Sequence, residues 1–305
     1  MIAPSPALGF GMLPEEDDGH AAEPSPYAGR VAVLATKHGK ERAVAPAMAH
    51  LLGLEVVVPD QIDTDVLGTF SGDVARPGSM LQTAVAKARL GMALEGRTLG
   101  LASEGRYGVH PRVPILRGGL ELMVLVDGER DLVIHQEMVM DRLRCRHWAL
   151  GPEDDVLAVA EEADFPAHGL LVRPAAPPGP SRAVPVCDVT ELAAAVAREA
   201  ARSEDGRAVI FNDMRADRNP ARMMALDRLA HRLARRVRTS CPNCSAPGFG
   251  LLRRPPGLPC QWCGTPSTMV SGEVHGCVSC DYREERGRSD GLTVADPGSC
   301  LRCNP

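Results

Sequence analysis

The chain has 305 residues, of which 44% are apolar and 3% aromatic, and its formal charge is −5 at pH 7. The length allows more than one domain and a sizeable hydrophobic core. The negative balance argues against attraction of nucleic acid or acidic membranes over the whole surface. No apolar run is long enough to predict a membrane span.

Residues 1–29 are rich in proline and contain the acidic run Glu15–Asp18. They lack the basic start and apolar stretch of a secretory signal, so we expect a disordered tail and a cytoplasmic protein. Thiols stay reduced in the cytoplasm, which favours metal binding over disulfides for the cysteines described below.

Strand-like and helix-like segments alternate from Arg30 to about Arg238. The expected strands are 31–36, 54–58, 98–102, 120–126, 132–135, 169–172 and 208–211. The expected helices are 41–52, 81–94, 156–163, 189–201 and 220–237. Asp127-Gly128 predicts a hairpin or tight turn. The alternation predicts one α/β domain over 30–238, with a mixed or mainly parallel sheet flanked by helices.

The first polar cluster, Thr36-Lys37-His38-Gly39-Lys40, follows the first expected strand and opens a helix. Backbone N–H groups at a helix start, together with the ammonium groups of Lys37 and Lys40, could hold phosphate. The alternative is a solvated turn with surface lysines.

The second cluster runs from Ser103 to Pro111, where two glycines and a proline favour a specific turn. Glu104 could bind a divalent cation or orient a water, and His110 could act as an acid or base. In the structural alternative, Glu104 only caps the turn and His110 is only the residue before a proline.

The third cluster, Asn212–Met223, places carboxylates and guanidinium groups at the end of an expected strand. Asp213 together with Arg215, Arg218 and Arg222 could bind an anion or a metal–phosphate. The alternative is an internal salt-bridge cluster, with Asn219 capping the following helix.

That helix carries basic residues directly before the cysteine-rich segment: Arg228, His231, Arg232, Arg235, Arg236 and Arg238. A basic helix beside a zinc module suggests a nucleic-acid or protein partner. Two observations weigh against this: aromatic stacking platforms are scarce, and arginines near a helix C-terminus also complement its dipole.

The last part of the chain, 239–305, contains four Cys-x-x-Cys knuckles: Cys241/Cys244, Cys260/Cys263, Cys277/Cys280 and Cys300/Cys303. Two thiolates in a tight turn bind one side of a metal and a second knuckle completes the tetrahedron, so the spacing predicts two structural zinc ions in a small ribbon-like module. Sequential, nested and cross-braced pairings use the same ligands. The turn residues slightly favour nesting, with Cys260/Cys263 opposite Cys277/Cys280.

Several motifs resemble an uncharacterised bacterial family, a domain of unknown function, over about Gly29 to Pro305. They are Ser103-Glu-Gly…Gly108-x-His-Pro111, Asp213-Met-Arg-Ala216…Asn219-Pro-x-Arg-Met223, Cys241-Pro-x-Cys244…Pro247-Gly-Phe249, Gly257-Leu-Pro-Cys-x-Trp-Cys-Gly264 and Asp296-Pro-x-x-Cys-x-x-Cys-Asn-Pro305. The resemblance implies no known activity.

Residues 31–107 are distantly similar to the inosine/xanthosine triphosphate pyrophosphatase fold. The matching motifs are Thr36-Lys37-x-x-Lys40, Ala84-x-x-Lys87-Ala88 and Glu104-Gly105. The resemblance implies that Lys37, Lys40 and Lys87 contact phosphate and that Glu104 binds magnesium. Gln82 replaces an expected acidic residue, and Asp73 or Asp213 would have to supply a second carboxylate.

The resulting hypothesis is a magnesium-dependent enzyme or binder acting on a nucleotide or another phosphorylated small molecule. Glu104, Asp213 and His110 are its candidate catalytic residues, and Lys37, Lys40, Lys87, Arg215 and Arg222 its candidate phosphate contacts. The competing hypothesis is a non-enzymatic adaptor, in which the zinc module and the arginine-rich helix bind protein or nucleic acid.

Overall fold

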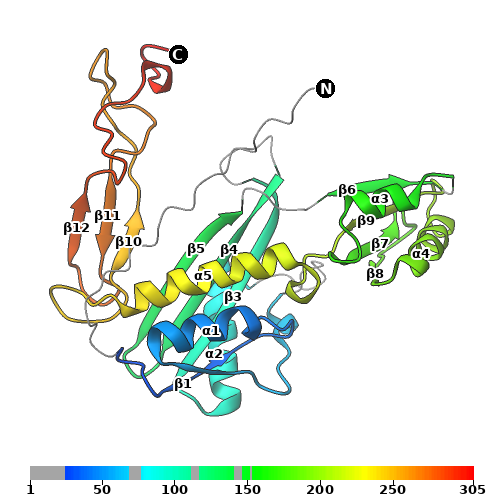
Figure 1. Cartoon of the computed structure of the whole chain (residues 1–305), viewed down its shortest axis with the longest axis horizontal. Coiled ribbons are helices and arrows are strands. Elements are labelled where there is room, and N and C mark those ends of the chain that lie inside the picture. Colours follow the sequence, from blue (N-terminus) through cyan, green and yellow to red (C-terminus); the bar gives the residue numbers. More distant parts are fainter. Residues whose placement is uncertain (1–24, 69–76, 111–116, 141–145, 152) are drawn as a thin grey trace, which may run out of the picture.

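A computed structural model describes residues 25–68, 77–110, 117–140, 146–151 and 153–305. Most of the expected tail, together with Asp73 and Pro111, lies outside these residues. The described chain forms three sheets, of five, four and three strands. Figure 1 shows them as a central body with two projecting units.

The main sheet, in the central body, has the strand order β2-β1-β3-β4-β5. Its strands are β1 (Val31–Leu34), β2 (Glu55–Val57), β3 (Leu99–Val109), β4 (Arg117–Asp127) and β5 (Leu132–Met140). β1 pairs in parallel with β2 and β3, whereas β3, β4 and β5 are antiparallel. The predicted mixed sheet and the hairpin after Asp127 are therefore confirmed.

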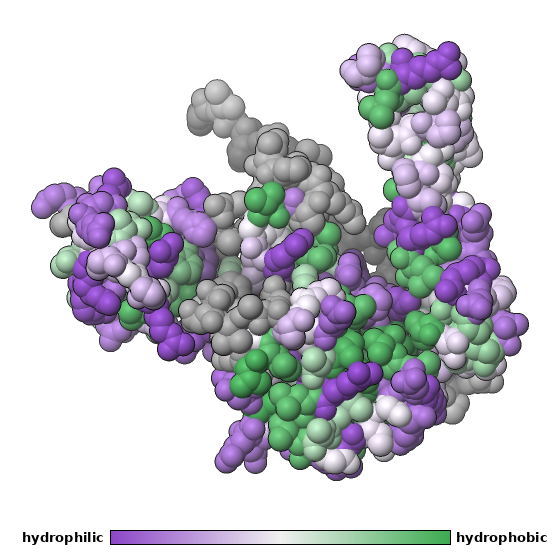
Figure 2. All heavy atoms as spheres, turned by 180° about the vertical axis from the view of Figure 1, so that it is seen from behind, coloured by the Kyte–Doolittle hydropathy of each residue, from purple (hydrophilic) through white to green (hydrophobic). Residues whose placement is uncertain are grey.

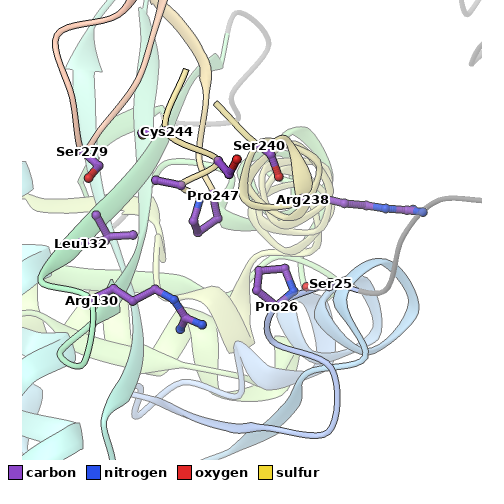
Figure 3. Close-up of a pocket in the computed structure, with 11 residues that line it drawn as sticks. Ser25, Pro26, Arg130, Leu132, Arg238, Ser240, Cys244, Pro247 and Ser279 are labelled. Carbon is purple, nitrogen blue, oxygen red and sulfur yellow. The ribbon is translucent and has the colours of Figure 1, made fainter. Parts of the chain in front are cut away.

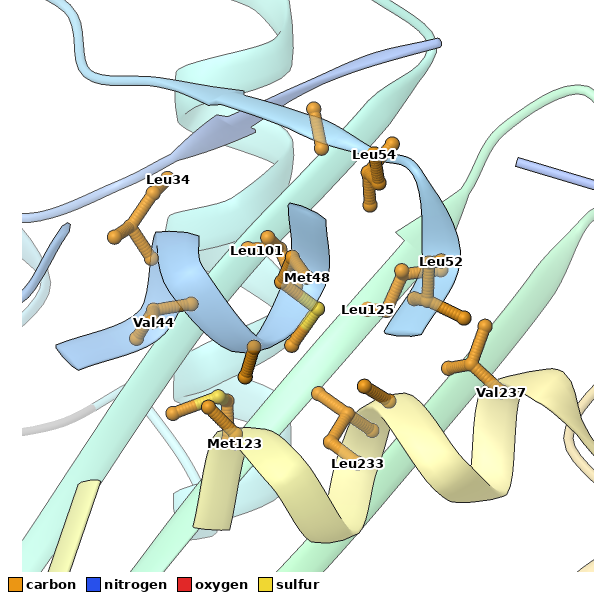
Figure 4. Packing of buried hydrophobic residues seen from close by; sticks show 14 of the residues in the cluster. Leu34, Val44, Met48, Leu52, Leu54, Leu101, Met123, Leu125, Leu233 and Val237 are labelled. Carbon is orange, nitrogen blue, oxygen red and sulfur yellow. The ribbon is translucent and has the colours of Figure 1, made fainter. Parts of the chain in front are cut away.

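Helices cover both faces of the main sheet. α1 (Glu41–Leu52) and α5 (Pro220–Arg238) pack on one face, where Met48, Met123 and Leu233 belong to a single buried cluster (Figure 4). α2 (Met80–Glu95) packs on the other face, where its alanines contact the side chains of β3 and β4. We call these the α1/α5 face and the α2 face.

Local sequence signals set the ends of these helices. Ser79 and Gln82 form a reciprocal capping box at the start of α2. Asn219 caps α5 as expected, because its side chain accepts a hydrogen bond from the N–H of Arg222 at 2.9 Å. Gly53 ends α1 with a positive φ of 61°, a conformation that costs glycine little.

The second polar cluster was expected in a loop, and this expectation was wrong. β3 continues to Val109, so Ser103, Glu104 and Gly105 lie inside the strand and pair with Met123, Leu122 and Glu121 of β4. The eleven-residue pairing with β4 outweighs the turn propensity of the glycines. Side chains therefore alternate between the two faces of the main sheet along this segment.

A second sheet, in the order β6-β9-β7-β8, lies between β5 and α5 in the chain and is fully antiparallel. Its elements are β6 (His147–Leu150), α3 (Val156–Glu162), β7 (Leu170–Pro174), β8 (Val184–Val186), α4 (Val189–Ala201) and β9 (Ala208–Asn212). This unit has its own hydrophobic cluster, which includes Leu170, Leu192 and Ile210. The region 30–238 thus holds two sheets with separate cores.

After α5 the chain enters the zinc module, residues 239–305, which contains β10 (Gly250–Arg253), β11 (Glu273–Gly276) and β12 (Arg283–Arg286). Short 3-10 turns occur at Thr64–Leu67, Ala216–Arg218 and Pro297–Ser299. Hydrophobic residues gather on the central body in Figure 2, between two more hydrophilic projecting units. Within the described residues, no helix has the length and apolar character needed to cross a membrane.

Candidate functional sites

The eight cysteines of the knuckles lie in two groups of four, and within each group the ligand atoms are within 4.8 Å of one another. The closest sulfur–sulfur distances are 3.8 Å for Cys241–Cys280, 3.6 Å for Cys244–Cys277, 3.9 Å for Cys260–Cys303 and 3.7 Å for Cys263–Cys300. A tetrahedral site with zinc–sulfur bonds of about 2.3 Å requires sulfurs about 3.8 Å apart. Each group therefore fits one zinc ion.

The pairing of the knuckles is cross-braced, and the expectation of nesting was wrong. The first knuckle joins the third in one site, and the second joins the fourth in the other. The cause is strand register: β10 pairs with β11 so that Gly250 lies opposite Gly276. The knuckle before β10 is thereby brought beside the knuckle that follows β11. The backbone of Cys260 in turn forms an isolated parallel β-bridge with that of Ala295, near the fourth knuckle.

Hydrogen bonds to sulfur lower the pKa of two of these thiols, Cys263 and Cys280. The pKa of Cys303 rises instead to about 12, because its hydrogen bond with Cys263 favours the protonated thiol. The pKa of Cys244 also rises to about 12, because burial and the neighbouring cysteine sulfurs outweigh the backbone hydrogen bond at Ala246. The N–H groups of Ser279 and Cys280 point to Sγ of Cys277 at 3.2 and 3.4 Å. Hydrogen bonds from Thr265 lower the pKa of Cys263 to about 6, and the backbone N–H of Tyr282 lowers that of Cys280 to about 7. Since zinc binds thiolates, these donors favour metal loading.

The first zinc site rests on the central body. Phe249 packs with Cys241 and Cys277, and Val278 packs against the α1/α5-face core. A cleft of about 810 Å³ lies at this junction, with Arg130, Arg238 and Cys244 among its lining residues (Figure 3). A closed set of four thiolates leaves no position for a substrate, so a zinc ion held here would be structural.

The first polar cluster forms a different kind of site. Lys40 directly precedes α1 and is buried, and its ammonium donates to Oγ and O of Ser103 at 3.0 and 3.3 Å. It contacts no carboxylate in the described part of the chain. Burial, assisted by the nearby positive charge of Arg222, lowers the pKa of Lys40 to about 8. Among the described residues, the hydrogen bonds of this buried cation go to neutral oxygens, and the carboxylates of Glu121 and Glu104 attract it without a direct ion pair.

Arg222 lies on the same face of the main sheet, on α5. Its Nε–H donates to Oε1 of Glu121 at 2.7 Å and its Nη1 donates to the carbonyl of Met214 at 2.6 Å. Burial opposes the charge of Arg222, but the Glu121 carboxylate outweighs this effect and raises the pKa of Arg222. Tyr107 completes the group, with its hydroxyl on Glu121 and its ring under the guanidinium.

Lys87 and Glu104 form an ion pair of 2.5 Å on the α2 face. Glu104 and Ser103 are neighbours in β3, so their side chains point to opposite faces of the main sheet. Lys40 and Lys87 therefore contact neighbouring residues of β3, Ser103 and Glu104, from opposite faces of the main sheet. Glu104 is paired with Lys87 rather than with Lys40.

The remaining candidates are arranged as follows. Lys37 forms an ion pair of 2.9 Å with Asp63, close to solvent. Asp213 is buried and accepts hydrogen bonds from Arg215, which matches the internal salt-bridge alternative. His110 directly follows Val109, the last residue of β3, and lies six residues beyond Glu104. At about 3.3 Å per residue of extended chain, His110 and Glu104 are about 20 Å apart.

Sequence reasoning missed Glu121 and Tyr107. A signal for Glu121 was present, because it is the only charged residue in the apolar run Gly118–Val126. A lone carboxylate at a core position of a strand requires a buried partner. Arg222, 101 positions later, is that partner, and no local pattern connects the two residues.

The fold and the sites define an α/β protein with a C-terminal module of two interleaved four-cysteine sites. The chain belongs to the family described as domain of unknown function DUF6671, whose model matches residues 87–305. The resemblance to an uncharacterised family is thereby confirmed for that range. No curated protein and no solved structure matches the chain. The similarity to the triphosphate pyrophosphatase fold therefore remains a prediction.

Proposed function

We propose that the main-sheet domain binds the phosphate of a nucleotide or another phosphorylated small molecule at the loop that follows β1. The supporting observation is Lys40, a buried ammonium that, within the described residues, donates hydrogen bonds to the two oxygens of Ser103. Burial of a charge is costly unless an opposite charge compensates it, and a phosphate oxygen would supply that charge.

The surroundings of Lys40 favour an anion. Among the described residues around Lys40, the buried charges are three cations, Lys40, Lys87 and Arg222, and two carboxylates, Glu104 and Glu121. Each carboxylate is already bonded to one of the other cations. The loop is open to solvent through the side chains of Lys37 and His38, which are 33% and 27% exposed. A phosphate entering there would also meet the start of α1.

The proposal is binding rather than magnesium-dependent hydrolysis. Within the described residues, only the two cysteine groups place three or more metal-binding side chains around one point. Glu104 is held by Lys87, and Asp213 by Arg215. These carboxylates do not form a shared cation site, so no hydrolytic step is assigned to them.

The test is a titration of the full-length protein with ATP, GTP and pyrophosphate, with and without magnesium, followed by calorimetry and thermal shift. Lys40→Met keeps the apolar stem and removes the charge. The matched control is Arg42→Met, on an exposed residue of the same helix. We expect binding to wild type and Arg42→Met and at least about tenfold weaker binding to Lys40→Met. Absence of binding to wild type, or equal binding to Lys40→Met, would sink the proposal. Release of inorganic phosphate that Glu104→Gln abolishes would show hydrolysis instead.

A further inference from the structure

A second site, independent of Lys40, lies between the central body and the zinc module. A groove of about 1230 Å³ runs between β5, α5 and the strands β10 to β12. Its lining includes seven arginines and one glutamate, Glu137: the arginines are Arg228, Arg232, Arg235, Arg236, Arg253, Arg254 and Arg286. This excess of six positive charges belongs to a chain whose net charge is −5. Positive charge is therefore concentrated in the groove.

The α5 wall of the groove is a regular row. Arg228, Arg232 and Arg235 are exposed and follow the spacing i, i+4, i+7, which places them on one side of a helix. At about 1.5 Å per residue the row extends about 10 Å. Arg253, Arg254 and Arg286 form the opposite wall, on the zinc module. A ligand in the groove would meet guanidinium groups on both sides.

Internal pairing accounts for only some of these arginines. Arg254 pairs with Glu273 at 2.7 Å and Arg286 with Glu284 at 2.8 Å. Arg236 donates to the carbonyls of Gly248 and His135 and so joins the zinc module to β5. Among the described residues, the side chains of Arg228, Arg232 and Arg253 form no hydrogen bond or ion pair with another side chain.

The helix dipole does not explain the row. The interaction of a cation with the dipole falls off within the last turn, and α5 ends at Arg238. Arg228 and Arg232 lie ten and six residues before that end. Like charges four residues apart also destabilise a helix slightly. An external polyanion would offset this repulsion.

We propose that the groove binds a single strand of nucleic acid through its phosphates. Guanidinium forks match phosphate oxygens in pairs, and two facing rows suit a strand that runs between them. Met138, Met224 and Leu251 offer apolar contacts for sugars and bases. Phe249 lines the groove but is only 3% exposed, so it is a poor stacking platform. We therefore expect binding with little sequence preference.

Proteins usually read a duplex by inserting a helix or strand into its major groove, which is about 12 Å wide. Here the protein itself forms the groove, with walls on both sides, so the geometry favours a single strand lying inside it. An acidic protein segment is the competing ligand. Carboxylates would satisfy the same arginines but would not give the salt dependence of a phosphate backbone, in which condensed counterions are released on binding.

The test is fluorescence anisotropy of the full-length, zinc-loaded protein with labelled single-stranded DNA and RNA, duplex DNA and polyglutamate, over a series of salt concentrations. The key variant is Arg228→Glu/Arg232→Glu. The matched control is Arg89→Glu/Arg97→Glu, which makes the same charge change at two exposed arginines outside the groove. Zinc content and the unfolding midpoint are measured for each protein, so that misfolding is recognised.

We expect the single strands to bind wild type and the control, and the groove variant to bind at least about tenfold more weakly. Loss of two phosphate contacts should reduce the slope of log K against log salt by about 1.4. Three results would overturn the proposal: no binding of single strands at low salt, equal loss in the control, or polyglutamate binding as tightly as the oligonucleotides. Tighter binding of duplex than of single strands would also reject the single-strand assignment.

Discussion

Arg222 on α5 and Glu121 on β4 are joined by a buried ion pair of 2.7 Å, although 101 positions separate them in the chain. The whole second sheet lies between them in sequence. The pair therefore fixes α5 to the main sheet at the point where the chain returns from that unit. It also places Arg222 beside Lys40, whose pKa it helps to lower.

We predict that Arg222→Met lowers the free energy of unfolding by about 3–5 kcal/mol, because it leaves the Glu121 carboxylate buried without its cation. The double variant Glu121→Leu/Arg222→Met should recover most of this loss, since it removes both charges. Urea unfolding of the zinc-loaded proteins measures both effects. A double variant as unstable as the single one would contradict the assigned pairing.

Gly105 allows the close approach of Tyr107 and Arg222 to the main sheet. A Cβ at this position would overlap with Oη of Tyr107 and lie 2.9 Å from Nη2 of Arg222. We therefore expect Gly105→Ala to destabilise the protein by about 1–3 kcal/mol through overpacking. Gly179→Ala is the control, because no atom lies within 4 Å of its added Cβ. Equal unfolding midpoints for the two variants would show that Tyr107 and Arg222 are not held as described.

The pKa of Lys40, about 8 in the folded protein, predicts a pH dependence of phosphate binding. The second pKa of a phosphate group is about 6, so above pH 7 the ligand is ionised and Lys40 is the group that changes. The affinity for ATP should fall as pH rises through about 8. In Lys40→Arg, which keeps its charge, the profile should stay flat. Calorimetric titrations at pH 7, 8, 9 and 10 would reveal the difference, and identical profiles would contradict the role of Lys40.

The same pKa has a consequence for stability with a defined sign. Between about pH 8 and 10.5 the unfolded chain holds a proton on Lys40 that the folded chain has released. The contribution of Lys40 to the free energy of unfolding therefore rises with pH over this window. Comparison of wild type with Lys40→Met by urea unfolding isolates this contribution. This contribution to the free energy of unfolding rises with pH, whereas the affinity for ATP is expected to fall.

Cross-bracing predicts which pairs of cysteine substitutions share one zinc. Cys241→Ser/Cys277→Ser should lose one zinc and keep the other, because both residues belong to one site. Cys241→Ser/Cys260→Ser should lose both. Native mass spectrometry counts the bound ions. Loss of both ions from Cys241→Ser/Cys277→Ser, with loss of only one from Cys241→Ser/Cys260→Ser, would support sequential pairing. Loss of a single zinc from Cys241→Ser/Cys300→Ser would support nesting.

Helices were predicted well where the periodicity and the residues at their ends are visible in a short stretch of sequence. α1 has the expected bounds Glu41–Leu52, and α4 the expected bounds Val189–Ala201. The short strands β6 and β8 were missed, because they have four and three residues and no clear alternation. The second sheet as a whole was missed for a related reason: β6 pairs with β9, some sixty residues later, and no local signal records such a pairing.

The candidate site shows the same limit. The candidate Lys40 could be named from the sequence, because a polar cluster between a strand and a helix is visible there, and its contact with phosphate stays a prediction. Lys40 is separated from Glu104 because side chains along β3 alternate between the two faces of the main sheet. That alternation requires the strand to continue to Val109, which its pairing with β4 ensures and the local sequence does not predict. Likewise, cysteine spacing gives the ligands, but the register of β10 on β11 decides which knuckles meet.

The interleaving of the knuckles links the two metals thermodynamically. Each zinc would close a chain loop that contains one knuckle of the other site. Once the first ion is bound, the chain has already lost part of its conformational entropy. Closing the second loop around the second ion therefore costs less entropy. Uptake of zinc by the apoprotein should therefore be cooperative, with a Hill coefficient above one. Chelation should likewise remove the two ions over a narrower range of chelator concentration than two independent sites would show.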